Sequence, residues 1–102
     1  MEKKKIVVVG CSSENGQYIC RELATSECAD IVAGFDTMFS TALTYPFKTC
    51  VTVDELKNLS IDIIVSSNEM PDDIQAFALS NNITIFTIKD ANAITKALEE
   101  YL

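Results

Sequence analysis

Two glycines and a carboxylate near the start of the chain have the spacing of a site that binds phosphate and ribose. Gly10 and Gly16 bound a short polar segment that directly follows an apolar run at residues 6–9. Glycines in such a turn allow the tight bend, the close approach of backbone to a pyrophosphate and close helix–strand packing. Asp36 ends a second apolar run, 20 residues after Gly16, and at this interval a carboxylate usually meets a ribose hydroxyl. The spacing predicts a dinucleotide crevice.

The middle of this turn departs from the pattern. Ser13 replaces the glycine that lets the backbone approach the pyrophosphate, although a serine hydroxyl can itself donate to phosphate. Glu14 places an acid where it repels a bound diphosphate by about 1 kcal/mol at the dielectric constant of solvent. Gly16 is kept, but its role is helix–strand packing, which the fold requires with or without a ligand. Asp36 has an alternative interpretation as a turn or capping acid.

Five short apolar runs, rich in valine and isoleucine, predict strands that are buried on both faces of a parallel sheet, at residues 6–9, 30–35, 49–53, 62–66 and 84–88. Segments with helical spacing separate most of them. Right-handed crossovers then give one α/β domain over residues 1–102, with a doubly wound, mostly parallel five-stranded sheet, most simply in the Rossmann-like order 3-2-1-4-5. In that order the turn at residues 10–16 faces Ser66 and Ser67 across a crevice.

Local signals mark the expected helix ends. Thr52 and Glu55 have the spacing of a capping box, which opens a short helix through Leu59. Pro71 suits a first helical position, and the asparagines at 81–82 suit a left-handed stop. Asp90 is expected to cap a final amphipathic helix.

Composition excludes several classes of function. Fifteen acidic against eight basic residues give a net charge of −7, so nucleic acids and anionic membranes are poor partners. The chain has no histidine, and its four cysteines form no C-x-x-C pair, so no metal site is predicted. No apolar run approaches the roughly 18 residues of a membrane span, and no signal peptide is visible. The sequence predicts a soluble, cytoplasmic protein.

Taken together, these stretches resemble the N-terminal NAD(P)-binding domain of dihydrodipicolinate reductase, an enzyme of lysine biosynthesis. The resemblance covers most of the chain and is carried by K-I-V-V-V-G-C-S-S-E-N-G-Q, A-D-I-V-A-G-F-D, Y-P-F-K-T-C-V-T-V-D-E-L, I-D-I-I-V-S-S-N-E-M-P and A-L-S-N-N-I-T-I-F. It implies that the turn holds the cofactor pyrophosphate and that Asp36 binds the adenosine ribose. The implied cofactor-binding residues are Gly10, Cys11, Ser13, Glu14, Asn15, Gly16, Asp36, Thr37, Ser66 and Ser67.

The chain also departs from this family. Residues 66–68 replace an Asp-Phe-Ser-like segment, and residues 87–90 replace a Gly-Thr-Thr-Gly turn that lies near the nicotinamide. The family's second domain, with its histidine pair, catalytic lysine and tetramer contacts, has no counterpart. A cofactor domain alone cannot position a second reactant for hydride transfer. We therefore expect a non-catalytic pseudoenzyme, without catalytic residues of its own, that binds NAD in preference to NADP, and only weakly.

Two alternatives remain open. Cys11 stands at an expected helix N-terminus, where a thiol pKa is lowered, and small IIB components of sugar phosphotransferase systems are similar in carrying a nucleophilic cysteine there. Alternatively, the uncharged, aromatic-rich connection at residues 37–47 could make the chain a protein-interaction domain, as a homodimer or with a partner. The self-contained final helix favours a natural short protein over a fragment. The sequence identifies neither a pathway nor a partner.

Overall fold

The structure, a computed structural model, describes residues 4–11, 13–25, 29–36, 47–66 and 70–87. Within them, five strands form one all-parallel sheet in the order β3-β2-β1-β4-β5. The strands are β1 (Lys4–Val9), β2 (Ala29–Phe35), β3 (Lys48–Cys50), β4 (Ile63–Ser66) and β5 (Thr84–Thr87). The predicted α/β class and the predicted strand order are therefore both confirmed.

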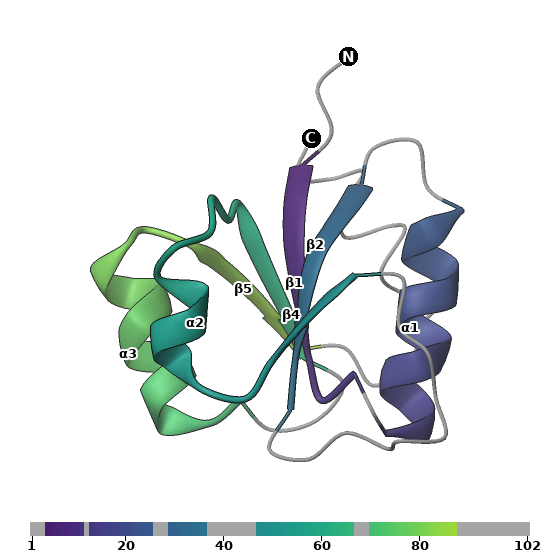
Figure 1. The fold of residues 1–102 in the computed structure, drawn as a ribbon, viewed down its shortest axis with the longest axis horizontal. Coiled ribbons are helices and arrows are strands. Elements are labelled where there is room, and N and C mark those ends of the chain that lie inside the picture. The colour runs from purple at the N-terminus through teal and green to yellow at the C-terminus, as the bar shows by residue number, and fades with distance from the viewer. Residues whose placement is uncertain (1–3, 12, 26–28, 37–46, 67–69, 88–102) are drawn as a thin grey trace.

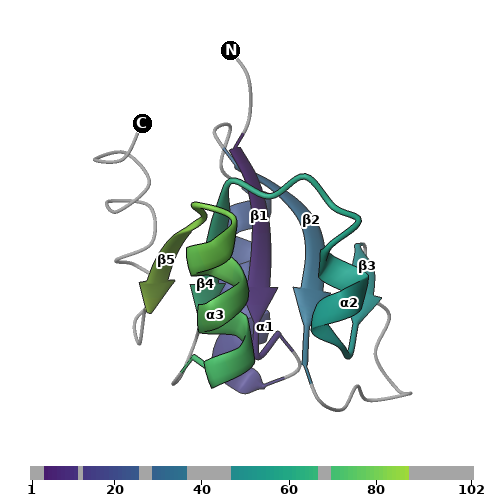
Figure 2. The same cartoon turned by 90° about the vertical axis from the view of Figure 1, so that its left-hand side faces the viewer.

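Helices cover both faces of the sheet. Helix α1 (Glu14–Ala24) lies against one face, and α2 (Val53–Leu56) and α3 (Asp72–Ser80) lie against the other (Figures 1 and 2). Crossover connections of this kind place the carboxyl ends of all five strands at one edge of the sheet, which is where open α/β sheets bind ligands.

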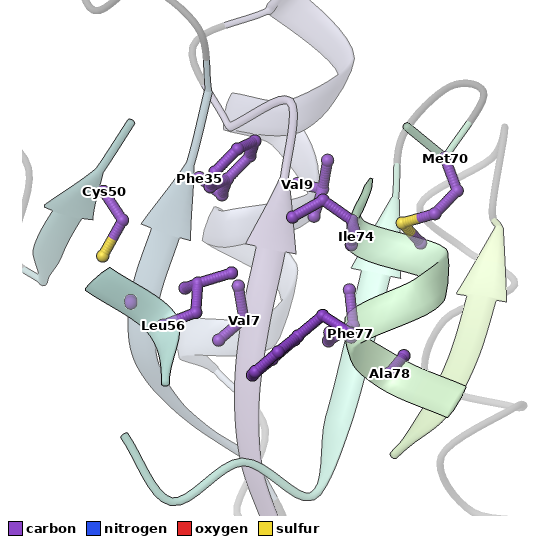
Figure 3. Close-up of a cluster of buried hydrophobic side chains, with 11 residues drawn as sticks. Val7, Val9, Phe35, Cys50, Leu56, Met70, Ile74, Phe77 and Ala78 are labelled. Carbon is purple, nitrogen blue, oxygen red and sulfur yellow. The ribbon is translucent and has the colours of Figure 1, made fainter. Parts of the chain in front are cut away.

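The continuous apolar run in β1 is explained by its central position. Ile6 and Val8 pack into a cluster with Ile19 and Leu23 of α1. Their neighbours Val7 and Val9 point to the opposite face, where they meet side chains from α2 and α3, among them Leu56, Ile74 and Phe77 (Figure 3). Each fully buried aliphatic side chain contributes about 1.5–3 kcal/mol, so the two clusters fix the strand between two layers of helix.

Two predicted helix boundaries are wrong by short distances. Helix α2 ends at Leu56 rather than Leu59, because the chain tightens into a turn in which the Leu59 N–H donates to the Leu56 carbonyl over 3.0 Å. Asn58 and Ser60 favour such turns over helix. Pro71 is the N-cap of α3, with extended ψ of 146°, and not its first helical residue.

The caps themselves are partly as expected. Thr52 is the N-cap of α2, but its hydroxyl lies 3.3 Å from the Glu55 carboxylate instead of accepting from the helix backbone. That carboxylate also accepts the Val51 N–H over 3.1 Å, one residue further back than a capping box requires. Asn82 has φ of 56°, which confirms the left-handed stop after α3.

Other expectations fall on parts of the chain that are not described. The final helix with its cap at Asp90 and the connection at residues 37–46 lie outside the described residues. None of the helices that are described is both long enough and apolar enough to cross a lipid bilayer.

Candidate functional site

The turn after β1 begins at Gly10 and lies at the carboxyl edge of the sheet. Gly10 has φ of 79°, a left-handed conformation that favours glycine. Its N–H donates to the carbonyl of Phe35, the last residue of β2, over 2.8 Å. The turn is thereby tied to the neighbouring strand at the point where that strand ends.

Ser13 closes the turn and caps α1. Its hydroxyl donates to the Gly10 carbonyl over 2.7 Å and accepts the Gly16 N–H over 3.0 Å. Its own N–H also donates to the Gly10 carbonyl, over 3.1 Å. The sequence left open a role for this hydroxyl as a phosphate donor, but here it donates within the turn.

Gly16 packs directly on the start of the turn. A Cβ at this position would overlap the Gly10 carbonyl oxygen and would lie 2.8 Å from the Cys11 Cα. Both neighbours are backbone atoms, which a side-chain rotation cannot move away. This confirms the prediction that Gly16 serves close helix–strand packing, and it accounts for the glycine without a ligand.

Asp36 is next to the turn, as its spacing predicted. It follows β2 directly, and its N–H donates to the Cys50 carbonyl at the end of β3 over 3.1 Å. The residue before Asp36 is Phe35, whose carbonyl accepts the Gly10 N–H. The Asp36 carboxylate is also close enough to Cys11 to act on the pKa of its thiol. The turn and Asp36 therefore lie at the same edge of the sheet.

Ser66 reaches the same edge from the other side of β1. It is the last residue of β4, is paired in register with Val9, and is 1% exposed. Ser67 and Thr37, together with the Asn15 side chain, lie outside the described residues. Of the predicted set, the structure therefore brings Gly10, Cys11, Ser13, Glu14, Gly16, Asp36 and Ser66 together around the ends of β1, β2 and β4.

A cleft of about 460 Å³ opens further along this edge, between β5 and the start of α3. It is lined by Met70, Asp72, Gln75, Ile85 and Thr87. Its volume falls in the range of small-molecule pockets. The cleft lies beside the edge strand β5, away from the switch point between β1 and β4 at which open α/β sheets usually bind ligands.

Cys11 is a core residue beneath the turn. Its side chain is fully buried, and its Sγ lies 2.6 Å from the position that a Cβ on Gly34 would take. Burial raises the pKa of the Cys11 thiol to about 12, with smaller contributions from Cys20 and Asp36 in the same direction. A thiol that is buried and protonated is a poor nucleophile, so this geometry does not favour the phosphocysteine carrier.

Gly34 is the position that sequence reasoning missed. It lies inside β2, opposite Val8, and its missing side chain makes room for Cys11 and for the Phe47 ring. A glycine within an apolar strand marks a close approach of neighbouring groups, and this signal was present in the sequence.

The side chain of Ser13 offers a direct test of how the turn is held. Replacing Ser13 by alanine removes both hydroxyl hydrogen bonds and leaves the Gly16 N–H without its acceptor. We expect the free energy of unfolding to fall by about 1–2 kcal/mol, measured by urea denaturation. The matched control is Thr25→Ala at the other end of α1, whose hydroxyl donates to the Glu22 carbonyl in an exposed position. A smaller loss for Ser13→Ala than for this control would contradict the capping role.

Neither a known protein family nor a curated protein sequence matches the chain. The resemblance to the reductase domain therefore remains a hypothesis that is carried by the residues themselves.

Proposed function

We propose that this chain is a non-catalytic, cytoplasmic relative of the cofactor domain of dihydrodipicolinate reductase that weakly binds a ribose-bearing nucleotide at the carboxyl edge of its sheet. One observation carries the proposal: Asp36 follows the strand whose last carbonyl accepts the Gly10 N–H. A carboxylate in this place beside the first turn of a Rossmann-type sheet suits the two hydroxyls of a ribose.

The same arrangement favours NAD over NADP. In NADP a phosphate is attached to the 2′-oxygen of the ribose, which Asp36 is proposed to bind. The negative charges of this phosphate and of the Asp36 carboxylate would lie close together and repel each other. The only arginine of the chain, Arg21, is in the last turn of α1, at the end of the helix away from the turn. Asp36 therefore has no arginine beside it to accept a 2′-phosphate.

Thermal unfolding with and without ligand tests this function. If NAD binds with a dissociation constant one tenth of the concentration added, the wild type gains about 1.4 kcal/mol, which raises Tm on the order of 6–10 °C. We expect this shift to disappear in Asp36→Ala and to be smaller with NADP. Asp30→Ala is the matched control, since Asp30 is exposed on the same strand near its opposite end. An unchanged wild-type Tm at 10 mM NAD and 10 mM NADH, together with no heat of binding, would remove the proposal.

A further inference from the structure

We draw no further inference here: the strongest candidate, the cleft between β5 and the start of α3, is lined by one acidic, two uncharged polar and two apolar side chains, and nothing among the described residues shows what would occupy it.

Discussion

Gly16→Ala is expected to destabilise the protein by about 3 kcal/mol or more. The new Cβ would overlap the Gly10 carbonyl oxygen and crowd the Cys11 Cα. Overpacking against side chains costs about 1–3 kcal/mol, but backbone neighbours cannot rotate away, so the cost is expected at or above the top of that range. For a domain of this size Tm should fall by about 12 °C or more.

The sign of this effect makes it diagnostic. In an exposed helix interior the same substitution stabilises by roughly 1 kcal/mol, because alanine is the better helix former. Tyr18→Ala is the control, since Tyr18 is two residues away on the exposed side of α1. Urea denaturation of both variants gives the comparison. An unchanged or raised free energy of unfolding for Gly16→Ala would show that α1 does not rest on the turn.

The sheet could be predicted from sequence because its central strands are buried on both faces. In β1, four consecutive residues from Ile6 to Val9 have at most 4% exposure, so no alternation appears, and the run indicates a parallel sheet directly. Such a run depends only on residue type. The handedness of crossovers then limits the possible strand orders, and 3-2-1-4-5 is the simplest of them. The edge strand β3 was harder: it is three residues long and two of them are exposed, so little apolar signal marks its ends.

The chemistry of the turn could be predicted only in part. The spacing of Gly10, Gly16 and Asp36 depends on the backbone path, which the fold fixes, and the structure places all three at one edge. The Ser13 hydroxyl, by contrast, makes local hydrogen bonds of 2.7 and 3.0 Å to residues three positions away in the chain. In such a turn a serine hydroxyl can serve either as a helix cap or as a donor to a ligand. Residue type does not decide between these two uses.

The thiol pKa of Cys11 also could not be predicted from residue type and position in the sequence. Its position at a helix N-terminus suggested a lowered thiol pKa, which the helix dipole alone would produce. The left-handed turn at Gly10 instead leads the chain so that Cys11 packs over Gly34 in the core. Desolvation by burial then raises the pKa of the Cys11 thiol and outweighs the lowering by a backbone hydrogen bond. Only a three-dimensional contact between residues 11 and 34 reveals this.

The buried thiols are expected to make the protein unstable in alkali. Burial raises the pKa of Cys11 from 9.0 to about 12 and that of Cys20 from 9.0 to about 11. At a pH between 9.0 and the raised pKa, each thiol keeps its proton in the folded state but has lost it in the unfolded chain. Stability is therefore complete below about pH 9 and falls as the pH rises towards 11, by up to about 1.4 kcal/mol per pH unit for each thiol.

The variant Cys11→Ala separates this effect from the titration of lysine and tyrosine, which is common to both proteins. At pH 8 the variant should have a lower free energy of unfolding than the wild type, because a buried side chain is shortened. Between pH 9 and pH 11 its free energy of unfolding should fall by about 2 kcal/mol less than that of the wild type. Urea denaturation at each pH gives both slopes. Parallel curves would mean that Cys11 ionises as readily in the folded protein as in the unfolded chain. The thiol would then be available as a nucleophile, and a phosphocysteine carrier would become the better hypothesis for this chain.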